Sequence, residues 1–113
     1  MERYKTFEEL KKGDSYYYFD YHRRESDGEL LFCFQEFPLV SIETTQIGVF
    51  CTRYDKRYNL NVVVDIFNHG LSSSNHFYAD KREIFDIIIS SNDFSESEIG
   101  EITKKYFLKK TSR

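Results

Sequence analysis

The chain has 113 residues, a formal net charge of −3 and an aromatic composition without tryptophan, with 11 Phe and 9 Tyr. This length corresponds to one domain, which can bury a hydrophobic core without metals or disulfides. The acidic balance argues against a general nucleic-acid coat, because such proteins present a broad basic surface. No apolar run is long enough to cross a membrane, and residues 1–14 lack the apolar region of a signal peptide.

Cysteine usage and composition bear on where the protein works. Cys33 and Cys51 stand in apolar stretches without a CxxC spacing, so we expect reduced thiols in a cytoplasm. Lys, Ile, Asn, Phe and Tyr are abundant, whereas the chain has only 5 Gly and 1 Pro. This bias is typical of an AT-rich coding sequence. It points to a low-GC bacterium, a phage or another mobile element, and so to the cytoplasm of a bacterial or phage-infected cell.

Helix start signals lie before and after a strand-rich middle region. A capping box that begins at Thr6 predicts a short N-terminal helix. In the segment 80–113, a D-x-x-E start at Asp80 and a second capping box at Ser95 predict two helices. We therefore describe residues 1–113 as a single domain, with a helix and a β-meander over 1–79 followed by a helical segment.

The middle region alternates strand-like runs with turn residues. Asp27-Gly28 is a strong hairpin signal, because a type I′ turn needs positive φ at both central residues. A second turn is predicted at Lys56-Arg57, and Pro38 predicts a bulge or bend because proline cannot donate to a ladder. The predicted strands cover Ser15–Arg24, Leu30–Phe37, Thr45–Tyr54, Leu60–Phe67 and His76–Ala79.

Side-chain alternation divides these strands into two faces, with Tyr21 opposite Phe34 and Cys51 opposite Val62. The apolar face is the predicted core: Tyr17, Phe19, Tyr21, Leu30, Phe32, Phe34, Val40, Ile47, Val49, Cys51, Leu60, Val62, Val64 and Ile66. The mixed face carries Tyr16, Tyr18, Asp20, His22, Arg24, Leu31, Cys33, Gln35, Phe50, Thr52, Tyr54, Asn61, Val63, Asp65 and Phe67. Either the C-terminal helices cover this mixed face, or its exposed aromatic patch implies a partner.

Residues 7–17, with Leu10, Lys11, Gly13 and Asp14, resemble the opening of many small SH3-like barrel proteins, in which a short helix ending in Leu-Lys-x-Gly-Asp leads into the first strand. The resemblance implies a fold only. Such barrels mostly bind proteins or nucleic acids, and a fold does not determine a function. We expect an α+β domain in which an antiparallel meander of four or five strands curls toward an SH3-like barrel, with a short N-terminal helix and two C-terminal helices.

Candidate catalytic and metal-binding groups are few. The predicted register sets His22 directly opposite Cys33, with Asp20 on the same strand, which is the residue set of a cysteine nucleophile. Strand centres lack the helix N-terminus and the oxyanion donors that such enzymes use, so we expect no catalysis. His69 and His76 do not match the spacing of a zinc site. We predict no enzyme, no cofactor and no metal.

The remaining features favour a non-catalytic binding module that docks onto a protein partner. A small bacterial accessory protein and a phage-encoded inhibitor of a host system both fit this description. Tyr, Phe and Arg are the residue types that supply binding hot spots. Two alternatives stay open: a nucleic-acid-binding small barrel that uses the hairpin Arg53–Tyr58, and a structural subunit of a phage or other assembly. The predicted contact residues are Tyr16, Tyr18, His22, Arg24, Arg53, Tyr54, Arg57 and Tyr58.

Overall fold

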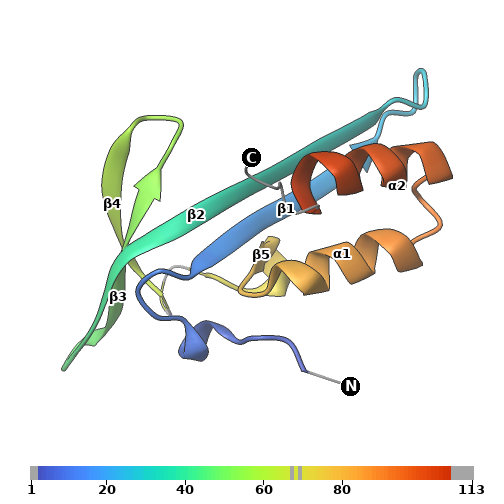
Figure 1. Cartoon of the computed structure of the whole chain (residues 1–113). Coiled ribbons are helices and arrows are strands. Elements are labelled where there is room, and N and C mark those ends of the chain that lie inside the picture. The colour runs from blue at the N-terminus through green and yellow to red at the C-terminus, as the bar shows by residue number, and fades with distance from the viewer. Residues whose placement is uncertain (1–2, 67, 69, 108–113) are drawn as a thin grey trace, which may run out of the picture.

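The computed structural model describes residues 3–66, 68 and 70–107, and consists of a five-stranded antiparallel sheet with two helices against one face (Figure 1). The strands are β1 (Ser15–Arg23), β2 (Leu30–Thr45), β3 (Gly48–Asp55), β4 (Leu60–Asp65) and β5 (Phe77–Tyr78). The helices are α1 (Lys81–Ser90) and α2 (Glu96–Ile102), with 3-10 turns at Phe7–Glu9 and Ser73–Asn75 and a π-helical turn at Thr103–Phe107. The predicted α+β class is confirmed.

The sheet is open, so the predicted closure to an SH3-like barrel is wrong. Its strand order is β4-β3-β2-β1-β5, which makes β4 and β5 the two edges. β1 and β3 lie on opposite sides of β2 and pair with different halves of it. The sheet therefore extends along β2 (Figure 1), and the two edge strands do not meet.

β2 is one strand of 16 residues, whereas the sequence predicted a strand that ends at Phe37. Its first half pairs with β1, and its second half pairs with β3 from Leu39 onward. The chain continues as a strand through Pro38 and turns only at Gln46-Ile47. Ile47, which was predicted for the core, therefore lies on a hairpin turn and is 80% exposed.

A β-bulge at Val40 explains why the prediction of a single core face is wrong. The ladder between β2 and β3 skips from Leu39 to Ser41, so Val40 is an extra residue. One extra residue shifts the alternation of a strand. Leu39 and Ile42 therefore join the same core while Val40 is exposed. The irregularity that was predicted at Pro38 lies at Val40. Beyond it, each β2 side chain lies on the face of the sheet opposite to the one that strict alternation predicts.

Apolar side chains form two cores, one on each face of the sheet. The helix-side core contains Phe19, Tyr78, Ile84, Ile88, Phe94 and Ile102, with Tyr17, Tyr21, Leu30, Phe32 and Phe34 packed against it. The opposite core contains Leu10, Tyr16, Phe37, Leu39, Cys51, Val64, Ile66, Leu71 and Ala79, with Val49 and Val62 packed against it. The predicted core residues are thus divided between the two, and Leu60 is exposed.

Both hairpin registers differ from the predictions by two residues. Phe19, in place of Tyr21, lies opposite Phe34, and Cys51 lies opposite Val64. The cause is loop length, because neither connection is the two-residue turn that the predictions assumed. A shift of two residues keeps each side chain on its face, since alternation along a strand has a period of two. These errors therefore changed cross-strand neighbours without changing the faces.

The predicted helix starts are confirmed. Asp80 caps α1, where its carboxylate accepts from the N–H of Arg82 over 2.9 Å. Ser95 caps α2, where its hydroxyl accepts over 3.2 Å from a backbone N–H of the first turn. The signal at Thr6 produces a single 3-10 turn. Residues 108–113 of the predicted helical segment lie outside the described residues.

Candidate functional site

Tyr16 belongs to the core, so its prediction as a contact residue is wrong. It is 1% exposed, and its ring lies 6.1 Å from that of Phe7, 5.2 Å from that of Phe37 and 6.0 Å from that of Phe77. Burial raises the pKa of its hydroxyl far above the usual range, and the nearby Arg53 charge acts in the opposite direction.

Tyr18 occupies an intermediate position on the same face as Tyr16. It is half-buried, with its ring centroid 5.3 Å from that of Phe77 and 6.2 Å from that of His76. Burial and nearby Asp20 raise the pKa of its hydroxyl. One side of this ring is therefore fixed by packing, and the predicted aromatic face is largely interior.

His22 and Arg24 lie at the far end of the β1–β2 hairpin, away from the other predicted contact residues (Figure 1). His22 is exposed. Arg24 donates to the Asp27 carboxylate over 2.9 and 2.6 Å and to Glu29 over 2.5 Å. Its charge is therefore balanced within its own loop, and the structure does not bring this pair together with the second hairpin.

The β3–β4 hairpin holds the other predicted residues. The Arg53 side chain is 15% exposed and its guanidinium lies 4.1 Å from the centroid of the Phe37 ring. The Tyr54 hydroxyl donates to the side-chain oxygen of Asn59 over 2.5 Å. At the tip, the Arg57 guanidinium lies 5.1 Å from the ring of Tyr58, which is 64% exposed.

The buried carboxylate of Asp55 stabilises the turn of this hairpin. It accepts from the N–H of Arg57 over 3.0 Å and from Nη1 of Arg53 over 3.5 Å. The carboxylate thus holds the backbone of the turn and one edge of a guanidinium. Consequently Arg57 lies in a turn whose backbone is held by Asp55, and the Arg53 side chain points into the protein.

The predicted pairing of His22 with Cys33 is wrong. Cys33 lies opposite Asp20, and His22 lies opposite Leu31. The Nδ1 atom of His76 is 3.7 Å from the Asp20 carboxylate. Both thiols are free; Cys33 is exposed, and burial raises the pKa of Cys51, which favours the neutral thiol. Across the described part of the chain, no three His, Cys, Asp or Glu side chains gather around a common point; His69 lies outside it.

The first half of β2 has an unpaired edge. Residues 30–38 pair with β1 on one side. On the other side, β3 begins its pairing only at Leu39, and no other described strand adjoins β2 there. An unpaired strand edge presents backbone donors and acceptors that can pair with another chain.

Hydrogen bonds at the two ends of the β1–β2 ladder determine which backbone groups face this edge. The N–H of Arg24 donates to the carbonyl of Glu29, and the N–H of Leu39 donates to the carbonyl of Asp14, each over 2.8 Å. Both bonds continue the register of the ladder, so its odd-numbered β2 residues bond to β1. In an antiparallel ladder, the intervening residues direct their N–H and C=O groups to the other side.

Phe34, Glu36 and Pro38 belong to these intervening residues. The free edge therefore presents the N–H and C=O groups of Phe34 and Glu36, followed by a proline that has no N–H to present. Proline is tolerated in a sheet only where a ladder donor is not needed. Its occurrence in the middle of a 16-residue strand is thus explained by the missing neighbour on that side.

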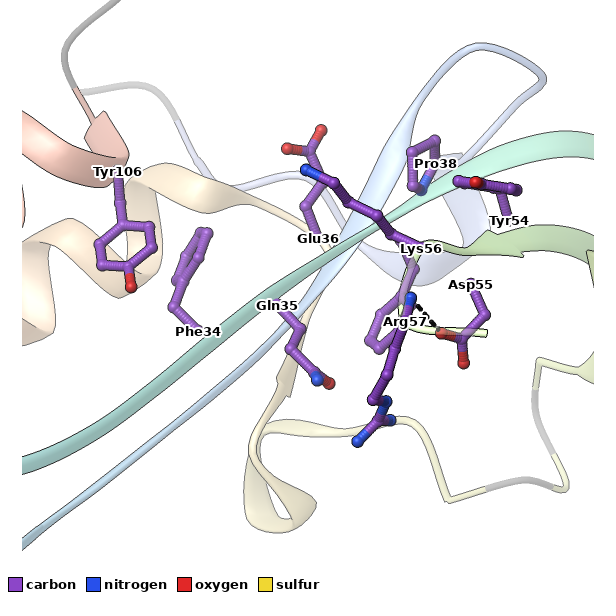
Figure 2. A pocket seen from close by; sticks show the side chains of 10 residues that line it. Phe34, Gln35, Glu36, Pro38, Tyr54, Asp55, Lys56, Arg57 and Tyr106 are labelled. Atoms are coloured by element: carbon purple, nitrogen blue, oxygen red, sulfur yellow. Dashed lines mark hydrogen bonds between the residues drawn. The ribbon is translucent and has the colours of Figure 1, made fainter. Parts of the chain in front are cut away.

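A cavity of about 590 Å³, which we call the edge groove, follows this free edge (Figure 2). It is lined by Phe34, Gln35, Glu36, Phe37, Pro38, Tyr54, Asp55, Lys56, Arg57 and Tyr106. Because successive side chains of a strand point to opposite faces, a cavity that touches five consecutive residues lies along the strand edge. Figure 2 shows Phe34 and Tyr106 at one end of the groove, and Tyr54 at the other.

A second cavity of about 350 Å³, the arginine pocket, lies on the face of the opposite core. It is lined by Tyr16, Tyr18, Cys33, Gln35, Phe37, Arg53, Arg57 and Phe77. Gln35, Phe37 and Arg57 line both cavities, so the two meet at the free edge. In Figure 2, Gln35 and Arg57 extend to the side of β2 that is opposite Glu36.

Sequence reasoning identified Tyr54 and Arg57 of the edge groove and Arg53 of the arginine pocket, but it missed the floor of the groove. The floor is the β2 edge at residues 34–38, and the prediction also missed Tyr106 in the wall. Pro38 carried the missing signal, since a proline within a strand marks an unpaired edge as well as a bulge.

Comparisons of this chain with protein-family models, with curated proteins and with solved structures found no match. The resemblance of residues 7–17 to SH3-like proteins therefore has no support beyond those residues. Among the residues that the structure describes, no helix has the length and apolar character needed to cross a membrane.

Proposed function

We propose that this protein is a non-catalytic binding module that adds an extended segment of a protein partner to the free edge of β2. The observation that carries the proposal is the edge groove, a cavity of about 590 Å³ that touches five consecutive residues of an unpaired strand edge. Strand addition is a recurrent mode of peptide recognition, in which backbone hydrogen bonds supply affinity and side-chain pockets supply specificity.

The walls of the groove support this mode of binding. Tyr54 and Arg57 come from the β3–β4 hairpin, and Tyr106 comes from the turn that follows α2. Tyr and Arg are the residue types most often found at the energetic centre of protein interfaces. Two separate segments of the chain thus flank one strand edge. Such a module acts by binding a segment of its partner, as an accessory subunit or an inhibitor does.

The nucleic-acid alternative has weaker support. Of its predicted basic contacts, Arg24 is paired with Asp27 and Glu29, and Arg53 is largely buried. Arg57 at the hairpin tip is the remaining exposed arginine of that set. Binding to single strands relies on a continuous cationic groove along the backbone. The net charge of −3 does not favour such a groove.

The proposal is tested by selecting ligands from a library of random peptides displayed on phage, followed by measurement of their affinities for two variants. Glu36→Pro removes an N–H from the free edge, whereas Glu36→Ala keeps it. Both variants lose the same side-chain bond from Ser15, which donates to Glu36 over 2.9 Å, so they are matched. Pro38 is two residues further along β2, and its backbone faces the same free edge, so the strand already accommodates proline at an equivalent position.

We expect the wild type and Glu36→Ala to bind the selected peptides equally. Glu36→Pro should weaken binding by about tenfold or more, because it removes a backbone hydrogen bond and blocks the strand edge. Equal binding by all three proteins, or failure to select any peptide, contradicts the proposal. Sedimentation separates the assembly alternative, because a second copy paired along this edge would give a dimer in place of the expected monomer.

A further inference from the structure

The arginine pocket contains two cationic side chains and no carboxylate. Arg53 and Arg57 line it together with aromatic, amide, thiol and hydroxyl groups. Neighbouring Asp55 does not line this pocket and is buried beneath the turn. Two guanidinium groups in a partly enclosed pocket that no carboxylate lines form an environment that favours an anion, because reduced contact with water strengthens the attraction between opposite charges.

Arg53 has hydrogen-bonding capacity that the described chain does not use. Its Nε atom is buried and has no acceptor among the described residues. Its contact with Asp55 is long, at 3.5 Å from Nη1, and its plane rests against the Phe37 ring at 4.1 Å. Buried donors in native proteins are nearly always paired, and guanidinium groups match carboxylates with two parallel bonds. Arg53 thus retains a donor that a carboxylate on a ligand would satisfy.

The relation between the two cavities specifies how that ligand is presented. The edge groove runs along the free edge of β2 and the arginine pocket lies on the face of the opposite core, and the two share Gln35, Phe37 and Arg57. A strand added to that edge sends alternate side chains to the two faces. One side chain thus enters the arginine pocket, while its two neighbours in the sequence point toward the face that carries Phe34 and Tyr106.

We infer that the arginine pocket binds the carboxylate of an Asp or Glu side chain in the extended partner segment, with apolar or aromatic residues on either side of it. This inference rests on the proposed function, because the segment is the strand added to β2. The expected sequence pattern in the partner is apolar–acidic–apolar, because successive side chains of the added strand point to opposite faces of the sheet. Arg57 contacts the segment from the hairpin tip, and Arg53 receives the carboxylate inside the pocket.

The test uses a random library displayed at the N-terminus of a phage coat protein, so that no selected residue has a free C-terminal carboxylate. Peptides selected by the wild type should share one acidic position between apolar residues. Replacing that acid by its amide in a synthetic peptide should weaken binding by about tenfold, the effect of losing a charged hydrogen-bonded pair. Arg57→Gln should abolish this difference, whereas the matched Arg24→Gln at the other hairpin should preserve it.

A second measurement avoids any variant that fails to fold. The NMR signal of the Arg53 Nε–H in the wild-type complex should differ between the acidic peptide and its amide form. Peptides that depend on the β2 edge, lost with Glu36→Pro, but share no acidic position overturn this inference and leave the proposed function standing. An Arg53 signal that is identical in both complexes also overturns the inference. Failure to select any peptide overturns both.

Discussion

Asp80 joins the N-terminal segment to the start of α1 through one buried carboxylate. It accepts from the N–H of Lys5 over 2.8 Å, from the N–H of Arg82 over 2.9 Å, and from the Arg82 guanidinium over 2.6 Å. The side-chain bond from Arg82 lowers the pKa of Asp80 to about 2, with help from both backbone N–H groups and against the effect of burial. The N-terminal segment and the start of α1 are thus held by one charge.

This charge makes a pH-dependent contribution to stability. Because the folded-state pKa of Asp80 lies below its unfolded value, its contribution is complete above about pH 5 and is lost as the pH falls toward 2. Asp80→Asn retains a good N-cap residue but removes the charge. We expect the variant to be less stable by about 2 kcal/mol at pH 7 and by much less at pH 2.5, measured by urea denaturation.

Comparison of the two proteins at each pH isolates Asp80. The pKa of Glu98 is also lowered to about 2, chiefly by a bond from Arg23, so Glu98 titrates in the same range. It titrates alike in the wild type and in Asp80→Asn, and its effect cancels in the difference. A stability difference that stays the same from pH 7 to pH 2.5 would show that the charge of Asp80 contributes nothing.

Tyr16 shows why single residues of the candidate site were hard to predict. Strand alternation separates Tyr16 from Tyr17, and one face of a sheet exposed to water is the usual expectation for such a pattern. Here the helices cover one face of β1 and the opposite core covers the other. A strand buried on both faces reads as a continuous apolar run, and the run Tyr16–Phe19 is of that kind.

For helices and strands, sequence signals that lie within one turn of the chain predicted the structure better than signals for pairing between separate segments. The capping residues identified both helices, because a cap is made within one turn of the chain. The hairpin registers were each wrong by two residues, because loop geometry depends on more than the two turn residues that mark it. The bulge at Val40 could not be located, since one extra residue in a ladder leaves little trace in composition.

The unpaired edge of β2 makes a prediction about proline substitution. Glu36→Pro places the missing N–H on the free edge, whereas Gln35→Pro removes an N–H that belongs to the ladder with β1. We expect Gln35→Pro to destabilise the protein by at least about 2 kcal/mol, because a carbonyl of β1 also loses its partner. Glu36→Pro should cost well under half of that. Thermal unfolding of both variants checks the difference.

The two substitutions lie next to each other on one strand, so they share the same local surroundings. Equal destabilisation by the two prolines would mean that both edges of this part of β2 are hydrogen-bonded. A larger effect at Glu36 than at Gln35 would mean that the bonding alternation of the ladder is the reverse of the one described. Either result would remove the structural basis of the edge groove.

At the scale of the whole molecule, the candidate site arises from the way in which two hairpins share β2. β1 pairs with one half and β3 with the other, on opposite sides (Figure 1). The half that lacks β3 is therefore open toward the β3–β4 hairpin, whose tip supplies Arg57 to the groove. No local pattern encodes this arrangement, because it depends on where a neighbouring strand begins to pair.

The α+β class was predictable from the sequence because strand-like runs and helix caps occupy separate regions. The open sheet was not, because closure depends on how far each strand extends beyond its partner. Of the predicted contact residues, Tyr54 and Arg57 line the edge groove, and Tyr18 and Arg53 line the arginine pocket beside the interior Tyr16. His22 and Arg24 lie at the opposite end of β2, so the fold brings only part of the predicted set together.

The most direct test of the central claim is residue-resolved amide hydrogen exchange along β2, with and without a peptide selected from the library. In the free protein, the amides of Phe34 and Glu36 should exchange rapidly while those of Gln35 and Phe37 are protected by β1. Bound peptide should protect Phe34 and Glu36 and leave the other two unchanged. Protection of the Phe34 and Glu36 amides before any peptide is added would show that the β2 edge is not free. Their continued rapid exchange in the complex would show that the peptide does not pair with this edge.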